Sequence, residues 1–303
     1  MKYEILDPRP VGDNSAIFAE GAQVLGIEVT VPTLAAQCNL GNIDPQHTGG
    51  NIDIAAIEAA LTANIPPADA TLVTVRADLD AVGAMVILQM RQEREEISPA
   101  MMERINQIAE SDKFARGGWP GIKALPTRDN PWPIQSAGTE DSPTLAAIAA
   151  AVADFKVSLE SRVEMMKIYL TTGQEPMNYV ERVEKERMDI IQALEDGTIE
   201  VCSDHQVATV VSTHRAATTI GYSQAPVVIA FNPAMQGKDG PYAKYSICQF
   251  EAGYINLKAI LEELNTLEAG WGGSPTIGGS PQGVCSNLTM EEVEAVVRKY
   301  LLQ

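Results

Sequence analysis

The segment Thr71–Ala84, TLVTVRADLDAVGA, places the tightest constraint on how this chain folds. Its first half, Thr71–Arg76, is an apolar β-branched run that predicts a buried strand. Asp78 and Asp80 follow at once, and a helix is predicted from Ala81. A buried strand that passes directly into a helix is the repeating unit of a parallel sheet, since parallel strands need a crossover connection. The segment therefore favours an α/β fold.

The residues around this segment repeat the alternation. Strands are predicted at Gly26–Val31 and Cys38–Ile43, and a helix over Asp53–Ala63 with Asp53 as its cap. Ser98-Pro99 starts a further helix that ends near Asp112. Alternation of this kind predicts an α/β domain with a doubly wound parallel sheet.

The second half of the chain has a different sequence pattern. After a Pro- and Gly-rich stretch, residues 144–196 read as helices, and the last hundred residues carry strands and two amphipathic helices. Thr289 and Glu292 form a capping box at the start of the final helix. We predict a first α/β domain at residues 1–125 and a smaller α/β domain with a mixed sheet at 198–303. A loop and helices at 126–197 connect them.

Composition narrows the classes of partner. The chain has 303 residues, with 22 Lys and Arg against 40 Asp and Glu, a formal net charge of −18. This acid excess argues against extended nucleic acid and anionic membranes as partners. No apolar run is long enough to span a membrane, no signal peptide is evident, and the four cysteines form no CxxC pair. We therefore expect a cytoplasmic protein; homo-oligomerisation stays open.

Acidic side chains and one histidine cluster at the predicted strand ends. Asp78 and Asp80 follow one strand, Asp44 and His47 follow another, and Asp112 ends a helix. Since ligands gather at the carboxyl ends of parallel strands, these residues are candidate ligands of manganese or magnesium. The structural alternative is that Asp78 and Asp80 only cap the helix that follows them.

The motif VRADLDAVGAMVIL resembles the first motif of the DHH phosphoesterases, a strand followed by D-x-D-x-x-G-S and a helix. The segment Trp271-Gly272-Gly273-Ser274, with Gly278-Gly279, is similar to the glycine-rich substrate loop of the DHH-associated C-terminal domain. The resemblance implies two α/β domains and metal-dependent hydrolysis of phosphoester or phosphoanhydride bonds. Its members include pyrophosphatases, nanoRNA and cyclic dinucleotide phosphodiesterases, and exonucleases.

The sequence departs from this family in three places. The histidine expected before D-x-D is replaced by Thr74 or Arg76, and the histidine of the C-terminal loop is Ser274. The nearest match to the DHH triplet, Asp44-Pro45-Gln46-His47, precedes the first motif. Either the N-terminal domain is circularly permuted or this match is accidental.

Two assignments of function stay open at this point. The first is an enzyme in which Asp78, Asp80 and His47 act in catalysis on a small phosphorylated substrate. Its substrate-binding residues would be the following: Arg76, Gly83, His214, Arg215, Gly272, Gly273 and Ser274. The second is an inactive relative that binds a nucleotide or a protein partner; a false resemblance would leave another α/β enzyme or a scaffold protein.

Overall fold

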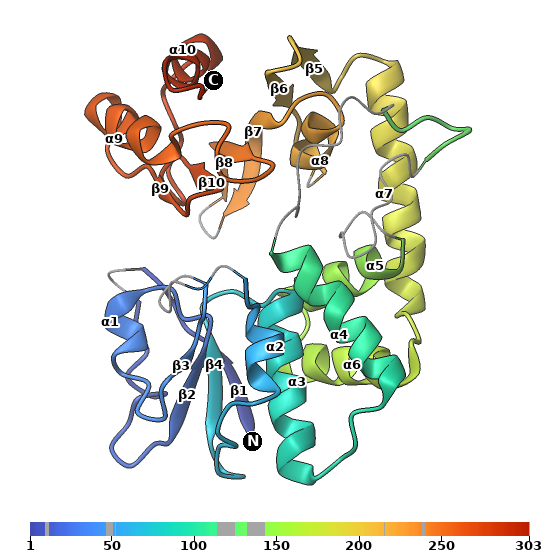
Figure 1. The fold of residues 1–303 in the computed structure, drawn as a ribbon, viewed down its shortest axis with the longest axis vertical. Helices are drawn as coiled ribbons and strands as arrows, with labels where there is room; N and C mark the ends of the chain where they lie inside the picture. The colour runs from blue at the N-terminus through green and yellow to red at the C-terminus, as the bar shows by residue number, and fades with distance from the viewer. Residues whose placement is uncertain are drawn as a thin grey trace. The chain divides into compact units, whose positions relative to one another are not determined.

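The computed structural model describes residues 1–9, 12–46, 51, 53–113, 125–131, 143–214, 216–237 and 240–302. The chain forms two compact units. Unit 1 comprises Met1–Lys113 and Gln135–Glu184, and unit 2 comprises Phe114–Ile134 and Lys185–Gln303. Each unit contains its own sheet and helices (Figure 1). The predicted α/β class, with a parallel sheet and a separate mixed sheet, is confirmed.

Unit 1 is built on a four-stranded parallel sheet in the order β1-β4-β2-β3. Its strands are β1 (Lys2–Ile5), β2 (Val24–Ile27), β3 (Asn42–Ile43) and β4 (Thr71–Thr74). The helix α1 (Pro32–Ala35) lies on one side of this sheet, and α2 (Ala56–Ala60) and α3 (Leu79–Glu93) lie on the other (Figure 1). This is the doubly wound arrangement that strand–helix alternation predicts.

Further helices follow α3 along the chain. They are α4 (Pro99–Asp112), α5 (Pro143–Val152), α6 (Leu159–Thr172) and α7 (Met177–Glu195), which continues into unit 2. The helix α3 contacts α2, α4, α5 and α6, and residues 79–88 are all buried. The helix α4 begins where the sequence predicts, because the Ser98 hydroxyl accepts a hydrogen bond from the Met101 N–H at 3.3 Å.

Two strands of unit 1 are shorter than their sequence patterns predict. The strand β2 ends at Ile27 because Glu28 has a left-handed backbone, with φ of 50°, which takes the chain out of the sheet. The strand β3 is reduced to Asn42–Ile43. Glu28 and Asp44 consequently stand just beyond the carboxyl ends of adjacent strands.

Unit 2 holds a six-stranded mixed sheet in the order β5-β6-β7-β8-β10-β9, in which only β6 and β7 pair in parallel. Its strands are β5 (Glu200–Ser203), β6 (Val207–Val211), β7 (Val227–Gly237), β8 (Gly240–Gln249), β9 (Gly272–Gly273) and β10 (Ile277–Gly279). Its helices besides the end of α7 are α8 (Ala217–Tyr222), α9 (Leu257–Leu267) and α10 (Met290–Lys299). The capping box predicted at Thr289 and Glu292 is confirmed.

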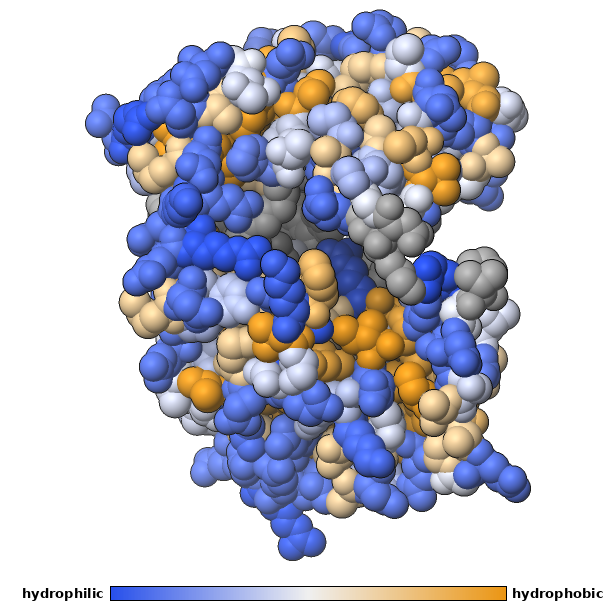
Figure 2. Space-filling model, turned by 180° about the vertical axis from the view of Figure 1, so that it is seen from behind, coloured by the Kyte–Doolittle hydropathy of each residue, from blue (hydrophilic) through white to orange (hydrophobic). Residues whose placement is uncertain are grey.

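The described surface is largely hydrophilic, in keeping with the charge of the chain. Figure 2 shows hydrophilic residues over most of the visible surface, with apolar side chains gathered in part of unit 1. Among the described residues, no helix combines the length and the apolar character that crossing a bilayer requires.

Candidate metal centre

The candidate site of unit 1 lies at the carboxyl ends of its parallel strands. Glu28 follows β2, Asp44 follows β3, and Asp78 lies beyond β4. The strands β4, β2 and β3 are successive neighbours in the sheet, so these acidic residues are brought to one edge. The arrangement is the one in which open parallel sheets bind ligands.

Three carboxylates at this edge lie close enough to share one cation. Glu28, Asp80 and Asp112 each offer one oxygen, and these oxygens lie within 4.8 Å of one another. We call these three residues the carboxylate triad. They come from the end of β2, the first turn of α3 and the last residue of α4. Glu28 is 8% exposed and Asp80 is 1% exposed, so their charges are removed from bulk water.

Asp80 is fixed in position by the N-terminus of a neighbouring helix. Its Oδ2 accepts the Ala56 N–H at 2.6 Å, and its Oδ1 accepts the Ile57 N–H at 2.8 Å. The prediction that Asp53 caps this helix is therefore wrong. The helix α2 begins at Ala56, and its first N–H groups donate to a carboxylate from α3. A carboxylate in this place also gains from the positive end of the helix dipole.

Asp78 has a separate local role. Its Oδ1 accepts the Ala81 N–H at 3.0 Å, so Asp78 is the N-cap of α3. The structural alternative considered for the D-x-D pair thus holds for Asp78, whereas Asp80 caps a different helix. Neither role prevents a carboxylate from also contacting a cation through its remaining lone pairs.

Asp112 is held by a glutamine from the segment that follows β3. The Gln46 side-chain amide donates to Asp112 Oδ2 at 2.6 Å. Gln46 belongs to the Asp44-Pro45-Gln46-His47 sequence that resembles a displaced DHH motif. Its neighbour His47 lies outside the described residues, so its predicted role as a ligand and catalytic group stays a prediction.

Burial and mutual repulsion shift the acidity of these groups. Burial raises the pKa of the Glu28 carboxyl well above its usual range, and the nearby carboxylates raise it further: Asp78, Asp80, Asp112 and Asp44. Burial also raises the pKa of Asp80, with Asp112 adding to the effect and the two α2 N–H groups opposing it. Several carboxylates crowded into one buried site carry a repulsive energy that a bound cation relieves.

The chemistry of the donors fits a hard divalent cation. Every member of the carboxylate triad offers oxygen, and carboxylate oxygen suits magnesium, manganese and calcium better than softer metals. Asp44 and Asp78 lie near enough to influence Glu28 electrostatically and stay candidate ligands. The residues of this edge thus fit the divalent metal that the sequence pattern favours.

Two predicted substrate contacts also lie near this edge. The Arg76 side chain is 83% exposed, and its Nε lies 3.6 Å from Asp78 Oδ2, so its guanidinium faces solvent beside the acidic cluster. Gly83 is buried within α3, where an added Cβ would clash with the Ile57 side chain. The close packing of α3 on α2 is therefore sufficient to explain this glycine.

The predicted substrate residues of unit 2 lie in a hairpin and a turn. Gly272 and Gly273 form β9, and a Cβ on Gly273 would clash with the Ile277 carbonyl oxygen across the hairpin. The Ser274 N–H donates to the same oxygen at 2.8 Å. His214 follows β6 and donates its backbone N–H to the Ser212 hydroxyl at 3.0 Å, while Arg215 lies outside the described residues.

Glu28 is the member of the triad that the sequence analysis missed. Its signal is a single acidic residue within the β-branched run GIEVTV, whose pattern predicts a continuous strand. A lone carboxylate in an apolar run marks either an exposed strand face or a strand end. The structure shows a strand end, with the side chain buried beside Asp80.

Comparison with known proteins finds distant likenesses among solved structures. No family model matches the chain, and no curated protein matches it. Among solved structures, the pGpG-specific phosphodiesterase PggH from Vibrio cholerae is 14% identical, with a TM-score of 0.40 over 77% of this chain and 79% of that one. An uncharacterized protein from Helicobacter pylori G27 is 11% identical, with a TM-score of 0.19 over 76% and 68%. At such levels, function has to be inferred from the residues of the site.

Proposed function

We propose that this chain is a metal-dependent hydrolase of a small phosphoester or phosphoanhydride. The observation that supports the proposal is the carboxylate triad: three acidic side chains from three separate elements, with oxygens within 4.8 Å of one another at the carboxyl edge of a parallel sheet. Buried carboxylates are costly to hold together without a cation. Manganese or magnesium is the metal we expect.

Each residue of the edge has a distinct part in this proposal. Glu28, Asp80 and Asp112 hold the cation, and Asp44, Asp78 and His47 are further candidate ligands. A divalent cation supplies Lewis acidity, which makes water a better nucleophile and stabilises charge on the phosphoryl oxygens. The exposed guanidinium of Arg76 is suited to a phosphate group, since it is planar and offers several donors.

The substrate is expected to be small. With a net charge of −18, the chain repels long polyanions, whereas a small substrate can be bound by a few local donors. In unit 2, His214, Arg215, Gly272, Gly273 and Ser274 stay candidate contacts to its phosphate or base. Gly272 has open space around it, because a Cβ there meets no atom of the described residues within 4 Å.

The proposal is tested by metal-dependent hydrolysis with matched variants. The protein is stripped of metal, supplied with Mn²⁺ or Mg²⁺, and assayed with bis(p-nitrophenyl) phosphate, pyrophosphate and a 5′-phosphorylated dinucleotide. We expect Asp112→Asn to abolish hydrolysis and Glu103→Gln to leave it unchanged. Glu103 is the matched control because it is an exposed carboxylate on the same helix, α4.

Two results would count against this proposal. Hydrolysis that is equally fast in Asp112→Asn and wild type would remove the triad from the reaction. Binding of metal or nucleotide without hydrolysis of any substrate class would favour the alternative function, an inactive relative that acts as a binding protein.

A further inference from the structure

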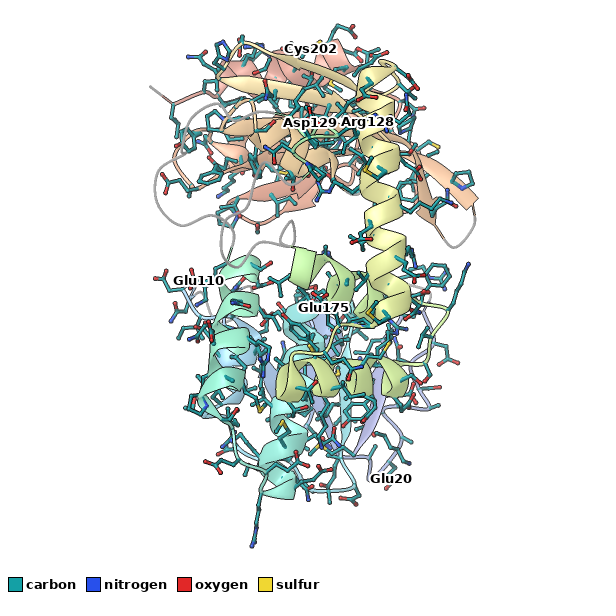
Figure 3. The ribbon with its side chains drawn as sticks, turned by 90° about the vertical axis from the view of Figure 1, so that its right-hand side faces the viewer. Glu20, Glu110, Arg128, Asp129, Glu175 and Cys202 are labelled. Carbon is teal, nitrogen blue, oxygen red and sulfur yellow. The ribbon has the colours of Figure 1, made fainter. Side chains whose placement is uncertain are left out.

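A buried lysine that pairs with a glutamate immediately follows the triad residue Asp112 in the chain. The Lys113 ammonium lies 2.5 Å from Glu58 Oε2, and the Lys113 side chain is only 3% exposed. A second carboxylate is that of Glu110, on the last turn of α4 (Figure 3). It lies 3.5 Å from the same ammonium. A charge this far from water is retained only when it is paired, so the pair fixes where Lys113 sits.

Both partners are connected to the triad through the backbone. Lys113 is the residue that immediately follows Asp112, so fixing its side chain also restricts the end of α4. On the other side, Glu58 Oε2 accepts the Ala55 N–H at 2.9 Å, at the start of α2. The next two N–H groups along this turn are those that Asp80 accepts. The N-terminus of α2 therefore holds Asp80 directly and Asp112 through Glu58 and Lys113.

We infer that the Glu58–Lys113 pair positions Asp112 against Asp80, with Lys113 as a positioning residue for the metal site; this inference rests on the proposed function. Besides this pair and the Gln46 contact to Asp112, α4 is anchored further back along the helix. There the Arg104 side chain donates to the backbone carbonyls of Leu170 and Thr171 on α6. Four apolar side chains of α4 are also buried: Met101, Ile105, Ile108 and Ala109. Such packing holds the helix on the protein, whereas the pair sets the orientation of its last turn.

The test measures the affinity for Mn²⁺ in the full-length protein by isothermal titration, with hydrolysis as a second measurement. Lys113→Met is expected to weaken Mn²⁺ binding by about tenfold or more, since removing a group that orients a ligand typically costs 10–100-fold. Lys113→Arg keeps the charge and is expected to restore binding to within about threefold of wild type, on the same scale.

Lys167→Met is the matched control. Lys167 on α6 is another well-covered lysine of unit 1, 18% exposed and paired with Glu93 at 2.9 Å and Glu95 at 2.8 Å. Its loss removes a paired lysine of similar kind, but its partners lie away from the triad: Glu93 is the last residue of α3, at the opposite end of that helix from Asp80. We expect this variant to bind Mn²⁺ with wild-type affinity whatever its melting temperature.

A second variant with a milder change keeps the test valid if Lys113→Met does not fold. Glu58→Gln keeps the size of the side chain and an oxygen for the Ala55 N–H, and it removes the charge opposite Lys113. We expect it to weaken Mn²⁺ binding about tenfold, at the low end of the effects found for such orienting groups.

The outcomes separate this inference from the function on which it rests. Wild-type protein that binds Mn²⁺, together with Lys113→Met and Glu58→Gln variants of unchanged affinity, would overturn the positioning role alone. Failure of Lys113→Arg to restore binding would do the same, as would an equal loss in Lys167→Met. Wild-type protein that binds no Mn²⁺ would overturn both the proposed function and this inference.

Discussion

Replacing Glu28 by Gln should make the metal-free protein more stable and its binding of metal weaker. The change keeps the size of the side chain and the same left-handed backbone at this position, so mainly one charge is lost. In the metal-free protein the variant should unfold less readily than wild type, because one of the crowded buried carboxylates has become neutral. When metal is added, the free energy of unfolding of the variant should rise by less than that of wild type, because one charged ligand is missing.

The magnitude follows from the geometry of the triad. Two unit charges 4.8 Å apart repel by about 3.5 kcal/mol at the effective dielectric constant of about 20 that suits protein sites. The raised pKa of Glu28 limits this cost, since the group can take up a proton instead of carrying the charge. We therefore expect the free energy of unfolding without metal to rise by about 1–3 kcal/mol at neutral pH.

The assay is urea unfolding with EDTA and with Mn²⁺. A ligand at 100 times its dissociation constant stabilises wild type by about 2.7 kcal/mol, and a tenfold weaker affinity reduces this to about 1.4 kcal/mol at the same concentration. Glu4→Gln, an exposed carboxylate on β1, is the control and should change neither value. A Glu28→Gln variant that is less stable than wild type in EDTA, or that gains as much from Mn²⁺, would refute the reasoning.

Other substitutions test single contacts. Asp80→Ala should lower the free energy of unfolding by about 2–4 kcal/mol even in EDTA, because two backbone N–H groups of α2 lose a charged acceptor; urea unfolding measures this. Glu175→Gln should stabilise the protein at neutral pH, since Oε1 of this carboxylate is buried without a hydrogen-bond partner among the described residues, between α6 and α7 (Figure 3). In unit 2, Gly273→Ala should destabilise the hairpin by about 1–3 kcal/mol through its clash with Ile277, whereas Gly272→Ala should not. Thermal unfolding and substrate affinity are measured for both variants.

The sign of the Glu175 effect depends on pH. Burial first and Glu184 second raise the pKa of Glu175 in the folded protein, so the native state binds the proton more tightly than the unfolded chain. Its stabilising contribution is therefore fully present below the unfolded pKa of about 4.3 and is lost as the pH rises through the folded value. The advantage of Glu175→Gln should shrink as the pH falls toward 4.3. An advantage that grows on acidification would contradict this assignment. Unchanged stability of Asp80→Ala would contradict the role given to its two α2 contacts, and unchanged stability of Gly273→Ala would contradict the clash with Ile277.

The sequence by itself determined the features that depend on neighbouring residues. The strand that leads into α3, the Ser98 cap of α4 and the capping box of Thr289 and Glu292 are all readable from residues a few positions apart. The α/β class of both units follows from the same local patterns. Hydrogen bonds within one turn and periodic apolar positions need no knowledge of the rest of the chain.

The tertiary structure alone decided how the acidic residues meet. The sequence favoured Asp78 and Asp80 as equivalent, yet only Asp80 binds the N-terminus of α2, and Glu28 joins it because β2 lies beside β4. The pair of Glu58 and Lys113 is 55 residues apart in sequence (113 − 58) and carries no local signal. Strand order and helix docking are set by burial over the whole unit, so the convergence of side chains at the sheet edge cannot be read from any short segment.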